Sequence, residues 1–233
     1  GIVRYDGSSK FAEENRWGTF PSVSVGWNLA NESFFNVEAI SDLKLRAGYG
    51  EVGNSSIGDY EYQSLVQSSV SGGVNYNFGP NGDLVIGATR GSLANRDITW
   101  EVLRETNIGL DVSMFDGQLI LTGDYFMGDM EGLLASVSVP GTIGPAEETE
   151  ITINAVDMKR SGWEASLTYQ RTIGEFSFST TFNAWHATNE ITKLPFGVDE
   201  FPGYLSTSRL GIPLGQLFLV EYLGIYTSQE QIA

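Results

Sequence analysis

The chain of 233 residues contains no cysteine and a single histidine, His186. Without cysteine it can form neither disulfides nor thiolate-ligated metal sites, and one histidine excludes a multi-histidine zinc centre. Basic residues are also scarce, because 13 Lys and Arg stand against 29 Asp and Glu, for a net charge of −16. This acidic excess argues against a nucleic-acid partner, since the phosphate backbone is bound through Lys and Arg. We expect no nucleic acid, no cofactor and no metal.

Long hydrophobic runs are missing as well. No uninterrupted apolar stretch approaches the roughly 18 residues that a membrane-spanning helix requires, and the mean hydropathy is −0.10. The chain does contain 28 glycines, together with 5 Trp, 10 Tyr and 13 Phe. This combination favours strands, tight turns and aromatic belts at a membrane interface. A transmembrane β-barrel is compatible with it, because only every second residue of a strand must be apolar.

Alternation of apolar and polar residues predicts several long strands. The clearest case is a hairpin within residues 91–127, where one alternating run ends at Met114 and a second begins at Leu119. The Asp116-Gly117 pair between the two runs is a strong hairpin signal. Similar alternation extends over residues 19–29, 43–49, 163–170 and 176–185, and a last strand is predicted over 217–226.

The connections between these strands alternate in length. Short turns are predicted at Asp116-Gly117 and over 171–175, whereas long polar excursions cover 50–81, 128–159 and 189–215. Residues 6–17 are predicted to form a polar loop, and residues 30–42 a turn region. Long loops on one side and short turns on the other are typical of outer-membrane barrels. The clear strands have about 9–12 residues, the length that a tilted strand needs to cross a bilayer.

Two architectures fit strands that have one polar and one apolar face. In a soluble β-sandwich, such as a lectin-like binding module, the apolar face would pack against a second sheet. In a transmembrane barrel the apolar face would meet lipid and the polar face would line the lumen. The turn lengths favour the barrel. In it, four candidate residues would face the lumen and contact a plug or cargo: Asp111, Asp124, Asn183 and Trp185.

Three motifs have functional interpretations that their context weakens. Residues Gly48 to Gly53 match G-x-G-x-x-G, but no helix is predicted after them to bind a pyrophosphate. His186 could serve a hydrolase, yet the alternation places it on the apolar face. A long excursion is rich in carboxylates that could bind Ca²⁺, but EF-hand spacing is absent and a solvated acidic loop is favoured. These carboxylates are Asp129, Glu131, Glu147, Glu148 and Glu150.

Aromatic residues in the long excursions are the candidates for contact with cargo or a partner. They are Tyr60, Tyr62, Tyr76, Phe78, Phe196, Phe201 and Tyr204. Aromatic faces stack on sugar rings and on peptide side chains. Packing between loops, or against a partner protein, explains the same residues equally well.

Four segments spread over the chain carry a family likeness. They are RYDGSSKFAEENRWGTFPSVSVGWNL (4–29), SDLKLRAGYGEVGN (41–54), RGSLANRDITWEVLRETNIGLD (90–111) and GIPLGQLFLVEYLGIYTSQEQI (211–232). In this order they resemble the SusC/RagA family of TonB-linked outer-membrane transporters of Bacteroidetes. One departure is Arg96, where family members usually have proline, so the fixed φ of that turn is lost.

The resemblance implies an all-β fold, namely a segment of a 22-stranded antiparallel transmembrane β-barrel with a plug in its lumen. It also implies that the loops lie outside the cell, over 6–17, 50–81, 128–159 and 189–215, and that the turns lie in the periplasm, over 30–42, at Asp116-Gly117 and over 171–175. Residues 1–233 would form part of one barrel domain, without the plug and the final strands. The resemblance also implies TonB-energised import of oligosaccharides or peptides across the outer membrane, with a SusD-like surface lipoprotein as partner and no enzymatic activity. For the four lumen residues, contact with the plug is then favoured over contact with cargo.

Overall fold

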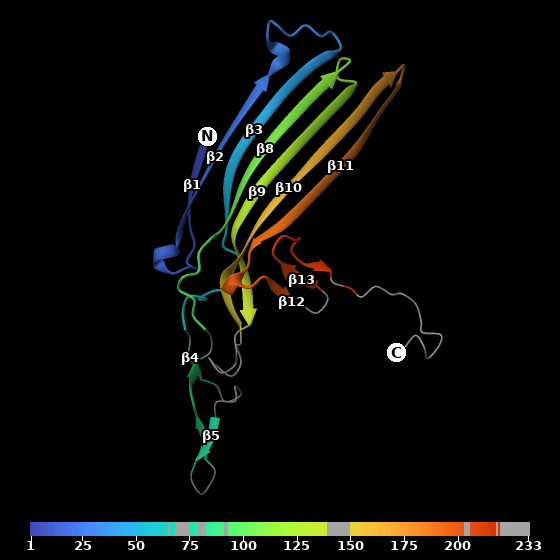
Figure 1. Cartoon of the computed structure of the whole chain (residues 1–233). Coiled ribbons are helices and arrows are strands. Elements are labelled where there is room, and N and C mark those ends of the chain that lie inside the picture. The colour runs from blue at the N-terminus through green and yellow to red at the C-terminus, as the bar shows by residue number, and fades with distance from the viewer. Residues whose placement is uncertain are drawn as a thin grey trace, which may run out of the picture.

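The computed structural model describes residues 1–64, 66–68, 75–78, 83–90, 93–138, 150–202, 206–217 and 219. Its main element is an antiparallel sheet of seven strands in the order β1-β2-β3-β8-β9-β10-β11, which lie side by side as a curved wall (Figure 1). The strands are β1 (Ile2–Gly7), β2 (Trp17–Asn28), β3 (Ile40–Asn54), β8 (Glu101–Met114), β9 (Leu119–Ser138), β10 (Glu150–Ile173) and β11 (Phe176–Lys193). The predicted all-β, antiparallel architecture is confirmed, and the sheet is not closed into a barrel within the described residues.

Short strands and 3-10 turns occupy the connections. β4 (Val66–Gln67) pairs with β7 (Thr89–Arg90), and β5 (Asn75–Phe78) pairs with β6 (Asp83–Ile86). A three-stranded sheet consists of β12 (Glu200–Pro202), β13 (Ser206–Arg209) and β14 (Gln216–Leu217). The 3-10 turns are η1 (Glu13–Asn15), η2 (Leu29–Asn31) and η3 (Pro195–Gly197). In the part of the chain that the structure describes, no helix is long and apolar enough to span a membrane.

Two strands are much longer than the alternation predicts. β9 has 20 residues and β10 has 24, so residues 128–138 and 150–159 continue the sheet, and the long loop predicted there is wrong. Register shifts between Asn154 and Val156 and between Val156 and Met158 break the period-2 pattern in this part of the hairpin. Each such shift moves the following side chains to the other face, so the strand no longer shows the alternation from which strands are predicted. Most of the last predicted strand, over 217–226, lies outside the described residues.

Short turns and long connections lie at opposite ends of the sheet (Figure 1). At one end, η2 leads from β2 towards β3, residues 115–118 join β8 to β9, and Gly174 and Glu175 join β10 to β11. The 115–118 turn holds Phe115, Asp116 and Gly117 at φ values of 55°, 55° and 82°. Asp and Gly tolerate this left-handed conformation better than most residues, which explains the Asp-Gly signal in the sequence.

The pairing register sorts the side chains onto two faces, which we call the polar face and the apolar face. The polar face carries Ser22, Ser24, Gly26, Lys44, Arg46, Gly48, Asn107, Gly109, Asp111, Thr122, Asp124, Gly162, Glu164, Ser166, Asn183 and Trp185. The apolar face carries Val23, Val25, Trp27, Leu45, Ala47, Ile108, Leu110, Val112, Leu121, Tyr125, Trp163, Leu167, Phe182 and His186. The faces predicted from alternation are therefore kept across all the central strands.

The apolar face has no second sheet over it among the described residues. Trp27, Trp163 and Phe182 are 48 %, 44 % and 68 % exposed. A soluble sandwich would have buried these side chains against a facing sheet about 10 Å away. The structure thus offers no support for the sandwich alternative.

Buried residues gather where the long connections leave the sheet. Phe11, Ile57 and Ile98 form one cluster, and the ring of Trp100 lies 5.1 Å from that of Phe11 and 5.4 Å from that of Phe20. A second cluster lies where β10 meets the end of β11: Ala155, Val156, Ile191 and Leu194. Together these clusters fix the bases of three connections against the sheet.

Asn154 links the segment before β8 to the irregular part of the β9–β10 hairpin. Its side-chain oxygen accepts a hydrogen bond from Thr99 N (2.8 Å), and its amide donates to Thr99 O (3.0 Å) and Gly132 O (2.9 Å). Gly132 has φ 65°, and its N–H donates to a carboxylate oxygen of Asp157 (2.8 Å). Side chains therefore satisfy backbone groups that the shifted register leaves unpaired.

Asn154→Ala should lower the free energy of unfolding of the full-length protein by about 2 kcal/mol, because three hydrogen bonds to backbone groups are lost. Unfolding in detergent micelles, followed by circular dichroism, measures this change. Asn107→Ala is the matched control, since the Asn107 side chain makes no hydrogen bond with the described residues, and it should change stability by less than about 0.5 kcal/mol. Equal effects of the two substitutions would contradict the role given to Asn154.

Candidate functional site on the polar face

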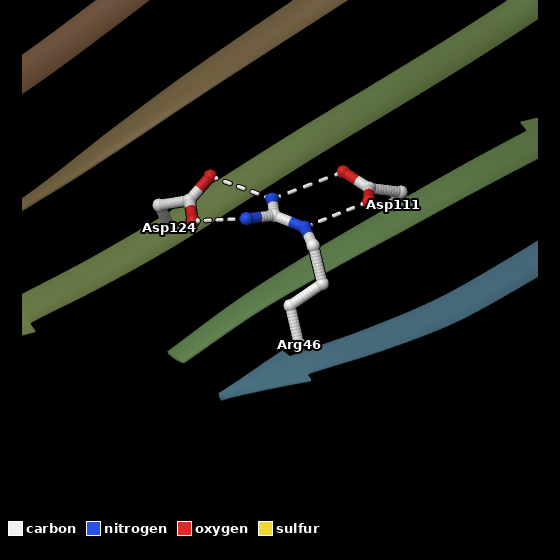
Figure 2. A network of polar contacts seen from close by, with 3 residues as sticks. All are labelled: Arg46, Asp111 and Asp124. Atoms are coloured by element: carbon white, nitrogen blue, oxygen red, sulfur yellow. Dashed lines mark hydrogen bonds and ion pairs between the residues drawn. The ribbon is translucent and has the colours of Figure 1, made fainter. Parts of the chain in front are cut away.

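Arg46 on β3 is the centre of a polar network that joins three strands (Figure 2). Its Nε and one terminal nitrogen donate hydrogen bonds to Asp111 on β8, at 2.8 and 3.0 Å. The two terminal nitrogens donate to the two carboxylate oxygens of Asp124 on β9, each at 2.9 Å. We call these three residues the arginine clamp. Four of the five N–H groups of the guanidinium are engaged, so Arg46 has little left to offer a ligand.

Gly109 on β8 makes the clamp possible. In register it lies between Arg46 on β3 and Asp124 on β9. A Cβ atom at this position would be 2.6 Å from Cζ of Arg46 and 2.5 Å from Oδ1 of Asp124, and both distances are shorter than any van der Waals contact. The guanidinium therefore lies flat across β8 only because the intervening residue has no side chain.

The same arrangement recurs further along the polar face. Arg160 on β10 donates a hydrogen bond to Glu105 on β8, and Gly128 on β9 lies between them in register. The ring of Phe126 lies over Gly162, where an added Cβ would come within 2.5 Å of the ring. Long side chains of the polar face thus lie along the sheet over glycines instead of projecting from it.

Negative charge exceeds positive charge around the clamp. Two carboxylates share the one guanidinium, and the nearby Lys44 stands opposite Asp111 in register. On the other side, Glu164 stands opposite Asp124 and is exposed. Glu164 and Trp185 are also register partners and line a shallow hollow of about 340 Å³. The polar face therefore combines a neutralised centre with an acidic flank.

The four predicted lumen residues all lie on the polar face, but the structure groups them differently. Asp111 and Asp124 meet through Arg46, whereas Asn183 and Trp185 line the hollow on β11. Arg46 is not among the site residues predicted from the sequence. The alternation of residues 43–49 does place an arginine on the polar face. Its partners lie on β8 and β9, and these strands come next to Arg46 only because β3 pairs with β8 across a long intervening segment.

The predicted loop aromatics are only partly described. Tyr60 and Phe196 are exposed, at 56 % and 70 %, and both have left-handed backbone conformations, with φ 65° and 59°. This conformation is unusual for a bulky residue and costs on the order of 1–3 kcal/mol. Tyr62 is half-buried in a turn. The backbones of Tyr76, Phe78 and Phe201 lie in short strands, while their side chains, and the whole of Tyr204, lie outside the described residues.

The structure places most residues of the remaining motifs. Residues Gly48 to Gly53 lie inside β3, so their glycines belong to a strand and do not form the strand-to-helix turn that binds a pyrophosphate. His186 lies on the apolar face opposite Trp163. Glu131 forms an ion pair with Arg104, and no group of three or more potential metal ligands occurs among the described residues. The carboxylates at positions 147 and 148 lie outside those residues.

The sequence is similar to those of TonB-dependent receptors. It matches the family described as "TonB dependent receptor-like, beta-barrel" over residues 3–222. It is 34 % identical over 202 residues to TonB-dependent receptor SusC of Bacteroides thetaiotaomicron, covering 84 % of this chain and 19 % of that protein. It is 33 % identical over 235 residues to TonB-dependent receptor P39 of Formosa agariphila, covering 99 % of this chain and 21 % of that protein.

The fold is similar to that of solved transporter structures. The RagAB peptide importer in its "closed-closed" state superposes with a TM-score of 0.84 and 27 % identity, over 96 % of this chain and 24 % of the other. The "open-open" state gives a TM-score of 0.76 and 28 % identity, over 91 % of this chain and 22 % of the other. The chain thus spans about a fifth to a quarter of the length of the proteins that it matches.

Gly109→Ala should lower the free energy of unfolding of the full-length protein by about 1–3 kcal/mol, because the new methyl group displaces the Arg46 guanidinium from both carboxylates. Chemical denaturation in detergent measures this. Gly123→Ala is the matched control, since a Cβ there has nothing within 4 Å, and it should be neutral.

A double-mutant cycle isolates the clamp from other effects of the methyl group. In an Arg46→Ala background, Gly109→Ala should cost no more than Gly123→Ala, because the group that it displaces is gone. If Gly109→Ala costs the same with and without Arg46, the glycine has a role independent of the clamp.

Proposed function

The chain belongs to the TonB-dependent receptor-like β-barrel family, and we propose that it forms part of the barrel wall of an outer-membrane importer of oligomeric nutrients. The observation that carries this proposal is the separation of a polar and an apolar face across the paired strands. The apolar face suits contact with lipid, and the polar face suits a lumen filled by water or by a plug. The full-length protein would thus be a multi-pass protein of the cell outer membrane.

Aromatic pairs near both ends of the apolar face support a membrane-spanning orientation. At the end with the long connections, the rings of Tyr5 and Trp17 stack with centroids 4.9 Å apart. At the end with the short turns, the ring of Tyr169 lies 5.6 Å from that of Phe178. Two aromatic girdles that enclose an apolar band are the expected signature of a barrel that crosses a bilayer. The long connections would then face the outside of the cell.

The proposed mechanism moves an intact molecule and breaks no bond. An oligosaccharide or peptide binds outside the membrane among the long connections, and a SusD-like lipoprotein closes over it. TonB then acts on a plug that lies in the lumen, and a path opens along the polar face. The exposed rings of Tyr60 and Phe196 are suited to stack on cargo, and left-handed backbones of this kind cluster at binding sites.

The arginine clamp has a supporting role in this mechanism. It ties β3, β8 and β9 together on the side that faces the plug, through charge-assisted hydrogen bonds that are stronger than neutral ones. Because the guanidinium is held by two carboxylates, the wall keeps its shape when the plug moves. We infer that Asp111 and Asp124 act through this wall and do not bind cargo.

Deleting the gene for the full-length protein should abolish cellular uptake of one oligomeric nutrient, because the proposal makes this protein the importer of that nutrient. Uptake of fluorescently labelled oligosaccharide and peptide mixtures measures this and names the cargo class. Deleting tonB in the same strain should give the same loss, and reintroducing the gene should restore uptake. Uptake of every labelled mixture at the parental rate after gene deletion would overturn the proposal.

A further inference from the structure

Trp185 on β11 is out of place on the polar face. Its side chain is 76 % exposed, and it makes no ring contact or hydrogen bond with the described residues. The other exposed tryptophans of the sheet, such as Trp27 and Trp163, lie on the apolar face, where lipid would cover them. Exposing an indole to water is unfavourable. A large aromatic surface on a polar wall therefore indicates a partner that stacks on it.

Glu164 on β10 is the immediate neighbour of this indole. The two residues are register partners, so their Cβ atoms are about 4.5–5.5 Å apart. Glu164 is exposed and makes no ion pair or hydrogen bond with the described residues. Its neighbour on the other side, Asp124, already binds Arg46. No cation among the described residues neutralises Glu164.

We propose that Trp185 and Glu164 form a cation subsite, which takes a guanidinium or alkylammonium group. The flat face of the indole attracts a cation through its quadrupole, and the carboxylate accepts charge-assisted hydrogen bonds from the same group. The hollow between them adds further acceptors from Ser166 and Asn183. The bound cation would thereby neutralise Glu164, the acidic residue beside the arginine clamp.

This inference rests on the proposed function, because it requires the polar face to line a lumen. Two sources can supply the cation there: a basic side chain of the plug, or a basic side chain of a peptide in transit. A neutral sugar could also stack on Trp185, but it would gain little from the charge of Glu164. The dependence on Glu164 therefore separates a cation from a sugar.

The test measures binding of tri-arginine to the purified full-length protein in detergent by isothermal titration calorimetry. Glu164→Gln and Trp185→Phe should each weaken binding about five-fold, from the loss of an ion pair and of the stronger cation–π partner. Two matched controls lie on the apolar face, Glu190→Gln and Trp163→Phe, and they should leave the affinity unchanged. Higher salt should weaken binding to the parent protein more than binding to the Glu164→Gln variant.

If a plug residue already fills the subsite, tri-arginine binds weakly to the parent protein and the readout moves to stability. Glu164→Gln and Trp185→Phe then lower the unfolding midpoint more than Glu190→Gln and Trp163→Phe do. Equal behaviour of all four variants in both assays overturns the subsite. It is also overturned if Trp185→Phe weakens binding of maltoheptaose while Glu164→Gln changes neither assay. Uptake at the parental rate after gene deletion, together with intact tri-arginine binding, would count against the proposed function and leave the subsite standing.

Discussion

The strict alternation of side-chain direction along a strand is the constraint on which the rest of this structure depends. Each strand has two kinds of side chain, and the pairing register keeps the two kinds apart over most of the sheet. A shift of one residue in a central strand would move its apolar side chains onto the polar face and its polar side chains onto the apolar face. The register is therefore determined by the different surroundings that the polar and the apolar face require, as well as by hydrogen bonds. The long β9–β10 hairpin departs from it only at the end with the long connections.

Glycine has a specific role on the polar face. At Gly109 and Gly162 the missing side chain lets a long neighbour lie along the sheet. Gly109 allows Arg46 to reach carboxylates on two strands, and Arg160 reaches over Gly128 to Glu105. Several charged side chains of the polar face are consequently paired with one another within the sheet. The pair of Trp185 and Glu164 is available to a partner, and so are the exposed aromatics of the long connections.

Much of the fold can be predicted from local sequence, whereas the arginine clamp is predicted less completely. The period-2 pattern of β8, β9 and β11 and the Asp116-Gly117 turn predict the central hairpins and the two faces correctly. The pattern fails beyond Gly128, because bulges that satisfy their backbone through Asn154 and Asp157 interrupt the alternation. The sequence places Arg46 on the polar face but does not identify its partners, because Arg46 and Asp111 are 65 positions apart in the sequence. The left-handed backbones of Tyr60 and Phe196 have no signal in the sequence at all.

The central claim is that the apolar face meets lipid and the polar face does not. The chain has no cysteine, so single cysteines at Leu121 and Phe182 on the apolar face, and at Thr122 and Asn183 on the polar face, can each carry a fluorophore in a cysteine-free full-length protein. The labelled proteins are placed in lipid nanodiscs that contain brominated lipids. Quenching by these lipids should be strong at positions 121 and 182 and weak at 122 and 183. Equal quenching at all four positions, or the reverse pattern, would contradict the account.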